Sequence, residues 1–179
     1  ADNDHAHIDF PKLRRGSVDG AFFALYVPSE MDDLPEEGFS YACRLLDGVN
    51  TEIDSNSESV ALASSYAEAL KNKDEGLFSI FLGLENGAAI SNSFEKLNYL
   101  YDRGIRYVTL CHARDNSICD SSASRQKRWH GLSPFGKDLV REMNRKGILI
   151  DVSHASDESF YDIIKYSTEP VVASHSCCR

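Results

Sequence analysis

The sequence lacks several features that would place it in a class at once. It has no apolar run near the roughly 20 residues that a membrane-spanning helix needs, so we expect no transmembrane segment in this chain. Basic residues are also few: 19 Lys and Arg stand against 28 Asp and Glu, for a formal net charge of -9. Nucleic-acid binding depends on clustered Lys and Arg, and the densest basic stretch, residues 125–128, is typical of a solvated loop. We therefore expect no nucleic-acid partner.

The common nucleotide and nucleophile motifs are missing as well. There is no G-x-G-x-x-G, no P-loop and no G-x-S-x-G elbow, and residues 83–87 (GLENG) lack the spacing for any of them. Two serines directly precede histidines, at Ser153-His154 and Ser174-His175. Neighbouring residues on a strand point to opposite faces, so we expect neither pair to act as nucleophile and base.

Cysteine usage bears on the compartment. The five cysteines are an odd number and include no metal-type C-x-x-C pair. This pattern favours reduced thiols in a cytoplasmic protein. The N-terminus is polar and acidic and does not read as a signal peptide, and a signal removed before residue 1 would instead indicate a secreted or periplasmic protein. The cysteines are Cys43, Cys111, Cys119, Cys177 and Cys178.

Strand and helix patterns alternate along the chain, with no linker between domains. Apolar strands between amphipathic helices are typical of a parallel sheet in an α/β fold. A (β/α)8 TIM-type barrel needs eight strands and typically ~250 residues, so a single domain over residues 1–179 with about five strands would be part of one. A doubly wound open sheet would also fit this length. We predict strands at 19–27, 78–84, 106–111, 148–152 and 170–174, and largely helical structure at 36–72.

Helix boundaries are marked in the second half of the chain. Ser133 and Pro134 predict a helix start and Gly147 its end, while Ser156 predicts the cap of a further helix. Asn92, with Glu95 three residues later, predicts the start of an earlier helix. The polar stretch from 113 to 130 between these helices is too long for a routine connection. We expect it to cover the mouth of a site, the alternative being a plain solvent loop.

Four of the predicted strands are followed by a potential metal ligand. In α/β proteins the carboxyl ends of parallel strands carry the chemistry. Glutamate and imidazole are ligand types that suit Zn²⁺, and a catalytic site leaves one position open. A single histidine after a strand is often only a hydrogen-bonded imidazole, but four such positions indicate a metal site. They are Glu85, His112, His154 and His175.

The N-terminal segment contains a second candidate. His7 and Asp9 form an H-x-D pattern that could chelate a metal from one strand. Residues 10–16 (FPKLRRG) do not read as a buried strand leaving the centre of a barrel. We therefore favour a role for His7 and Asp9 outside the metal site.

Seven stretches resemble the membrane (renal) dipeptidases, metallopeptidases built on an amidohydrolase-like barrel. They run in order over nearly the whole chain, which makes the resemblance specific. They are 7–16 (HIDFPKLRRG), 83–87 (GLENG), 107–112 (YVTLCH), 131–136 (GLSPFG), 142–145 (EMNR), 150–156 (IDVSHAS) and 173–176 (ASHS).

The resemblance implies a zinc-dependent dipeptidase that cleaves the peptide bond of a dipeptide by a metal-bridging water. It implies that Glu85 bridges two zinc ions and that His154 and His175 bind zinc. It also implies that His112 contacts the substrate and helps to polarise the scissile carbonyl. A non-catalytic relative, or an amidohydrolase-like protein with a different reaction, remains the alternative because the fold alone does not fix the chemistry. A homodimer is left open.

The chain also departs from the family pattern. The family's first H-x-D motif lies upstream of the stretch matched by residues 7–16, so His7 and Asp9 are look-alikes by this alignment. The family's catalytic Asp and a substrate-binding Arg lie downstream of the region matched by Arg179. We therefore expect the central part of a dipeptidase, with weak metal binding and negligible hydrolysis by the 179 residues alone.

Overall fold

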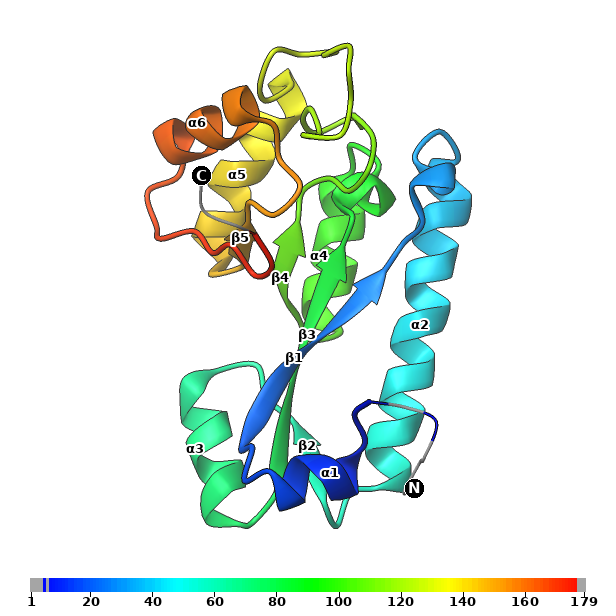
Figure 1. Ribbon diagram of the computed structural model, residues 1–179, viewed down its shortest axis with the longest axis vertical. Coiled ribbons are helices and arrows are strands. Elements are labelled where there is room, and N and C mark those ends of the chain that lie inside the picture. The colour runs from blue at the N-terminus through cyan, green and yellow to red at the C-terminus, as the bar shows by residue number, and fades with distance from the viewer. Residues whose placement is uncertain (1–4, 6, 177–179) are drawn as a thin grey trace.

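Five strands form one sheet in which every pairing is parallel (Figure 1). The computed structural model describes residue 5 and residues 7–176. The order across the sheet is β1-β3-β4-β5, and β2 also pairs with β3. This confirms the predicted α/β class with about five parallel strands. The strands are β1 Gly20–Tyr26, β2 Val60–Leu62, β3 Phe78–Glu85, β4 Ile105–Thr109 and β5 Leu149–Asp151.

Strand β3 is the axis of the molecule. It pairs with β1 along nearly its whole length, from Ser79 to Glu85. On its other edge β2 occupies the amino-terminal part and β4 the carboxyl-terminal part. As a result β2, α1 and α3 lie around one end of β3, and β4, β5 and the later helices lie around the other (Figure 1). The helices are α1 Phe10–Arg15, α2 Pro35–Ser55, α3 Tyr66–Asp74, α4 Phe94–Asp102, α5 Pro134–Lys146 and α6 Asp157–Tyr166, with short 3-10 turns η1 Ser29–Met31 and η2 Gly87–Ile90.

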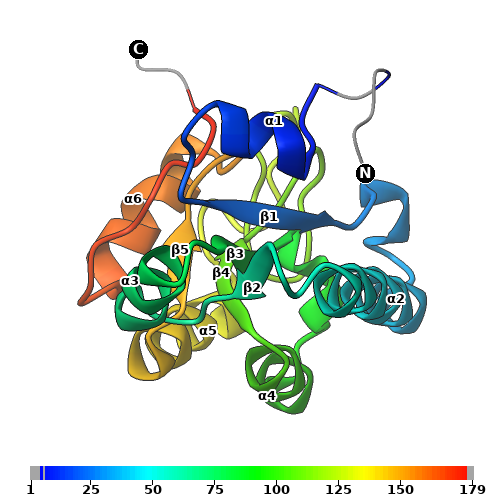
Figure 2. The same ribbon diagram turned by 90° about the horizontal axis from the view of Figure 1, so that it is seen from below.

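Helices α2, α4 and α5 lie along one side of the sheet, while α1 lies on the other side, next to β1 (Figure 2). The predicted ends of α5 are confirmed: Ser133 caps it by accepting the Gly136 N–H, and Gly147 closes it at φ +70°. Ser156 likewise caps α6. The apolar interior lies between helices and sheet, and its fully buried side chains include Leu46, Ile80, Leu82, Leu97, Leu100, Ile105, Leu139 and Met143.

The structure refines one sequence-based prediction and corrects two. The region 36–72 is largely helical as predicted, but β2 lies between α2 and α3. The predicted strand at 170–174 is reduced to one parallel bridge between Asp151 and Val172. Helix α4 is capped by Ser93 rather than Asn92, since the Ser93 side chain accepts the Lys96 N–H. Among the described residues the sheet stays open, because β1 pairs only with β3.

A close approach at Gly83 shapes the carboxyl half of β3. A Cβ atom at Gly83 would lie 1.8 Å from the ring of Tyr107 on β4, far inside any van der Waals contact. The pairing of β3 with β4 shifts its register between Leu82 and Gly83. Burial raises the pKa of Tyr107 to about 12, with Asp151 and Glu85 adding to the effect. Gly83 is therefore required for the packing that sets Glu85, two residues later, at the strand end.

The structure also bears on the expectations about the cysteine thiols and about membrane-spanning segments. Cys43, Cys111 and Cys119 are free thiols, in line with the reduced state predicted for them. Cys177 and Cys178 lie outside the described residues. Across residues 5 and 7–176, no helix combines the length and apolar character needed to cross a membrane.

Candidate metal centre

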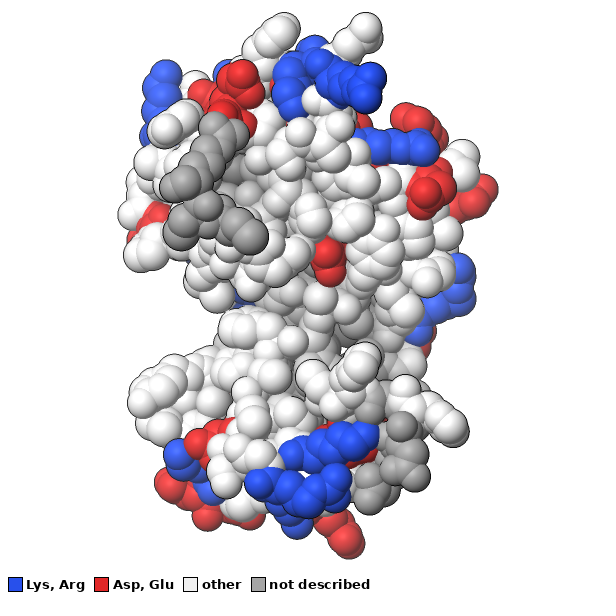
Figure 3. Space-filling model, in the orientation of Figure 1, with Lys and Arg blue, Asp and Glu red and all other residues white. Residues whose placement is uncertain are grey.

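The carboxyl ends of the parallel strands bring the four predicted site residues together. Glu85 is the last residue of β3, and His112 and His154 each follow the end of β4 or β5 by three residues. His175 follows the bridge residue Val172 by the same interval. In the face shown in Figure 3, one small acidic patch lies near the middle of the surface among uncharged atoms, whereas most other charged side chains, of both signs, lie toward the two ends. The geometry at this strand end thus matches the arrangement predicted from the sequence.

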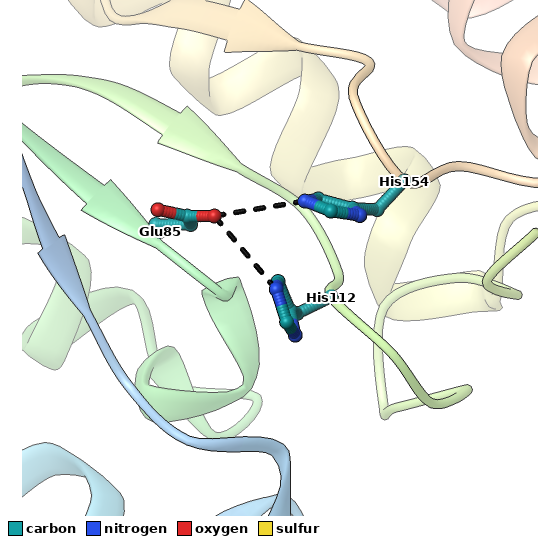
Figure 4. Close-up of side chains that lie close together, drawn as sticks. All are labelled: Glu85, His112 and His154. Carbon is teal, nitrogen blue, oxygen red and sulfur yellow. Dashed lines mark ion pairs between the residues drawn. The ribbon is translucent and has the colours of Figure 1, made fainter. Parts of the chain in front are cut away.

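One carboxylate oxygen faces all three imidazoles. Glu85 Oε1 lies 3.5 Å from His175 Nε2, 3.6 Å from His154 Nε2 and 3.9 Å from His112 Nε2. Figure 4 shows Glu85, His112 and His154 converging, with the second carboxylate oxygen of Glu85 directed away from the two histidines. The Glu85 side chain is 18% exposed, so the group is accessible at the bottom of the site without being free in solvent.

The donor set fits a metal ion. Glu85, His112 and His154 offer ligand atoms within 4.8 Å of one another. Glu85, His154 and His175 form a tighter set, because the two Nε2 atoms of His154 and His175 are 2.7 Å apart. The triangle of these three atoms has a circumscribed radius of about 1.9 Å, close to the roughly 2.0–2.2 Å of Zn–N and Zn–O bonds. One ion could therefore contact all three atoms with little movement of the chain.

The electrostatics of the centre favour neutral imidazole at His154. Burial lowers the pKa of His154, and the neighbouring His112 and His175 lower it further, while Glu85 partly offsets them. A histidine binds metal only in its neutral form. The lowered pKa therefore reduces the competition between protons and a metal ion at this side chain.

The whole chain, residues 1–179, matches the family model described as Membrane dipeptidase (Peptidase family M19). The chain belongs to the membrane dipeptidase family. It is 32% identical to Dipeptidase tcpJ of Claviceps purpurea over 176 residues, which cover 95% of this chain and 41% of that protein. It is 33% identical to Dipeptidase verJ of Clonostachys rogersoniana over 181 residues, covering 97% of this chain and 47% of that protein.

A solved structure shows the same fold. The probable dipeptidase PvdM from Pseudomonas aeruginosa matches with a TM-score of 0.91 and 26% identity, over 98% of this chain and 47% of that one. The chain thus spans less than half the length of these three relatives. The family is one of metallopeptidases, and the strand-end cluster is the candidate metal site of this member.

His112 has two partners that the sequence analysis did not identify. Its Nδ1 lies 3.4 Å from Ser29 Oγ and 3.5 Å from the hydroxyl of Tyr26. The Tyr26 and His112 rings are in contact, with a centroid distance of 4.7 Å and planes tilted by 60°. Tyr26 ends β1 and pairs in register with Glu85. Applying the strand-end rule to β1 as well would have drawn attention to Tyr26.

The long loop is anchored more firmly than its polar sequence indicates. Asp120, which is fully buried, accepts the backbone N–H groups of Arg128, Trp129 and Gly131. The Trp129 indole donates to the carbonyl of Asn116 within the same loop. These hydrogen bonds satisfy polar groups of the loop internally, so part of the loop is buried although few of its residues are apolar. A role as a cover stays a prediction.

The same loop supports the backbone of two site histidines. The Ser121 hydroxyl donates to the carbonyl of His112, and the Ser122 N–H donates to the carbonyl of His154 at 2.7 Å. His154 adopts φ +68°, a conformation that is uncommon outside glycine and that the loop contact helps to hold. The loop therefore supports the site by hydrogen bonds to the backbone of His112 and His154.

The Ser174-His175 pair differs from its sequence-based prediction. The Ser174 hydroxyl lies 2.8 Å from His175 Nδ1, although alternation along a strand predicted that the two side chains point apart. The reason is that residues 174 and 175 lie in a turn after the Val172 bridge and not in a strand. Ser174 is thus a partner of a site residue.

His7 and Asp9 lie away from this centre. Asp9 caps α1 by accepting the Lys12 N–H at 2.7 Å and pairs with the Lys12 ammonium at 3.1 Å. The next residue, Phe10, packs its ring against Phe78 at the first position of β3. This is the end of β3 opposite to Glu85, and Asp9 has a helix-capping role there.

Proposed function

We propose that the protein carrying this chain is a zinc-dependent dipeptidase, with residues 1–179 forming an incomplete part of its catalytic domain. The observation that carries the proposal is the convergence of Glu85 Oε1 with the Nε2 atoms of His154 and His175. Membership of the membrane dipeptidase family supports it. The substrate is a dipeptide, and the scissile bond is its single peptide bond.

Glu85, His154 and His175 would hold one zinc ion. The second oxygen of Glu85, directed away from the imidazoles, is available to a second ion (Figure 4). When bound, zinc polarises carbonyl oxygens and lowers the pKa of water toward neutrality. Two ions would require ligands in addition to these three, which agrees with a chain that spans less than half of its relatives.

His112 would contact the substrate. It is the imidazole farthest from Glu85 Oε1, at 3.9 Å, and its Nδ1 faces the hydroxyls of Tyr26 and Ser29. These hydroxyls hold the ring so that Nε2 faces the site. An N–H donor fixed there stabilises negative charge that develops on a carbonyl oxygen.

The test uses the full-length protein, with zinc content measured by mass spectrometry and hydrolysis measured on a panel of dipeptides. Glu85→Gln and His154→Ala should lose zinc and lower kcat/KM by more than about 100-fold, since even indirect partners of ligands cost 10–100-fold. Glu142→Gln, at a surface carboxylate paired with Arg145, is the matched control and should change neither. Zinc bound at this site without hydrolysis of any dipeptide would contradict the proposal in favour of a binding protein or a different hydrolase.

His112→Asn separates the role of His112 from that of the ligands. We expect zinc content to stay at the unmodified level while kcat falls by about 100-fold or more, as for removal of an oxyanion donor. Loss of zinc from this variant would instead make His112 a ligand, as its proximity to Glu85 and His154 also allows.

A further inference from the structure

Asp151 is a buried carboxylate that connects the elements carrying the three site histidines. It ends β5 and is fully inaccessible to solvent. Its Oδ1 accepts the backbone N–H groups of Ser153 and Ser174, both at 3.0 Å, and the Ser153 hydroxyl at 2.8 Å. Its Oδ2 accepts the hydroxyls of Thr109 at 2.7 Å and Ser174 at 2.6 Å. All five of these contacts bring hydrogen-bond donors to the Asp151 carboxylate.

The donors keep Asp151 ionised despite its burial. Burial alone would raise the pKa of Asp151, but the hydrogen bonds from Ser174, Thr109 and Ser153 outweigh it and lower the pKa. An ionised carboxylate only accepts hydrogen bonds. The hydroxyl proton of Ser174 is therefore committed to Asp151 Oδ2.

The direction of the Ser174 hydroxyl proton determines which ring nitrogen of His175 is protonated. With its proton directed to Asp151, the Ser174 oxygen can only accept from His175 Nδ1, 2.8 Å away. His175 must then carry its proton on Nδ1, which leaves a lone pair on Nε2. That Nε2 atom lies 3.5 Å from Glu85 Oε1 and shares a hydrogen bond of 2.7 Å with His154 Nε2, in which His154 is then the donor. A ligating nitrogen needs this lone pair.

A second arm of the network fixes the backbone. The Ser153 hydroxyl, which donates to Asp151, accepts the N–H of His175 at 3.1 Å. Ser153 directly precedes His154, whose backbone lies in the left-handed region. Through these hydrogen bonds the Asp151 carboxylate fixes the backbone segments that carry His154 and His175 relative to each other.

We propose that Asp151 is a positioning residue that, through Ser174, holds His175 in the Nδ1–H tautomer, with the Nε2 lone pair facing Glu85 and His154. The assignment of His175 as a zinc ligand rests on the proposed function, whereas the tautomer itself does not. Partners of this kind, one step removed from the metal, orient histidine ligands in many metal sites. Here the contact runs through a serine hydroxyl instead of a direct carboxylate–imidazole bond.

The first test reads the tautomer directly by ¹⁵N NMR of the metal-free full-length protein, at about pH 8, where histidine with an ordinary pKa of about 6.5 is neutral. We expect Nδ1–H at His175 in the unmodified protein. In Asp151→Asn the amide donates to Ser174, whose proton then turns toward His175, so Nε2–H should take over. An Nε2–H tautomer, or no preference, in the unmodified protein would overturn the proposal even if zinc binding and dipeptidase activity are established.

The second test measures zinc affinity by competition with a chelator. Ser174→Ala, at a solvent-exposed position that should not impair folding, is expected to weaken zinc binding by about 10–100-fold. Ser174→Thr keeps the hydroxyl and should retain the affinity. Ser55→Ala removes an exposed serine hydroxyl of α2 that donates to the carbonyl of Thr51 and lies outside the Asp151 network, so it should leave zinc affinity close to that of the unmodified protein. Equal losses in Ser174→Ala and Ser55→Ala would contradict the proposed path.

Discussion

The two ends of β3 have the same parallel strand environment but very different surroundings. At the carboxyl end, β4, β5 and the Val172 bridge extend the sheet, and their following residues converge on Glu85. At the amino end, β2 replaces β4 and is followed by a helix, and the charged groups there include the exposed pair Lys73–Asp19, whose side chains are 56% and 59% exposed. The difference shows that several neighbouring strand ends, and not the strand itself, create the candidate metal centre.

A cavity near the amino end reinforces the contrast. It has a volume of about 400 Å³ and is lined by α1, the start of β1 and the start of β3, with Arg14, Asp19 and Lys73 at its wall. Its charges are of both signs and it contains no histidine. At the carboxyl end, by comparison, three imidazoles surround one carboxylate. A hollow of similar volume, about 410 Å³, is lined in part by His175 at the carboxyl end, so the two ends differ in ligand chemistry and not in the volume of their hollows.

The largest expected effect comes from breaking the packing at the carboxyl end of β3. Gly83→Ala places a methyl group 1.8 Å from the ring of Tyr107, and overpacking of this kind should destabilise the fold by about 3 kcal/mol. Gly48→Ala in α2 meets nothing within 4 Å and should instead add about 0.5–1 kcal/mol. Urea unfolding should show a lower free energy of unfolding for Gly83→Ala and a higher one for Gly48→Ala.

A double variant sharpens this prediction. Tyr107→Val removes the ring that the new methyl group would meet, so Gly83→Ala should cost much less in the Tyr107→Val background than alone. Costs that simply add would show that the ring contact is not the cause of the destabilisation.

An intermediate effect is expected at Asp32, which adjoins the carboxyl end of β3. Its Oδ1 accepts a hydrogen bond from Asn86 at 2.6 Å, while its buried Oδ2 has no hydrogen-bond partner. Burial raises the pKa of Asp32 to about 6, although the Asn86 hydrogen bond opposes this. The folded state thus binds more protons than the unfolded state between pH 4 and 6, so this contribution to stability is full below about pH 4 and lost above about pH 6.

Asp32→Asn should remove the loss of folding stability that accompanies ionisation of Asp32. Because the group is only partly buried, we expect a gain of about 1 kcal/mol at pH 8 and little change at pH 4, measured by urea unfolding at both values. Asp33→Asn, at the exposed neighbouring carboxylate, should show no such difference between the two pH values. A gain at pH 4 as large as at pH 8 would mean that ionisation of Asp32 is not the cause.

The smallest effect is expected at the amino end of β3. Lys73→Met breaks the ion pair with Asp19, but both side chains are exposed and such pairs are screened by solvent. Thermal unfolding should show no resolvable shift, and zinc affinity should stay the same. A change in zinc affinity would show that the two ends of β3 are coupled.

Much of the site could be predicted from the sequence because parallel strands place their carboxyl ends at one edge. Glu85, His112, His154 and His175 were located by that rule alone. A second rule, that neighbouring residues of a strand point to opposite faces, failed at Ser174 and His175. The two side chains are in contact because both residues lie in a turn, where strand alternation does not apply. Asp151 was passed over because its importance depends on donors from three separate segments.

The fold shows the same division. Helix caps at Ser133 and Ser156 depend on local sequence and were predicted at the correct residues. Strand β2 has only three residues and no alternation to reveal it within a long helical pattern. The burial of Asp120 was missed because it depends on backbone groups 8 to 11 residues away folding back onto one carboxylate.

The most direct test of the central claim is the position of zinc in a crystal of the full-length protein, read from anomalous scattering at the zinc edge. The account predicts a peak within roughly 2.0–2.2 Å of Glu85 Oε1, His154 Nε2 and His175 Nε2. A peak beside His7 and Asp9 at the opposite end of β3, or zinc bound without Glu85 and His154, would contradict it.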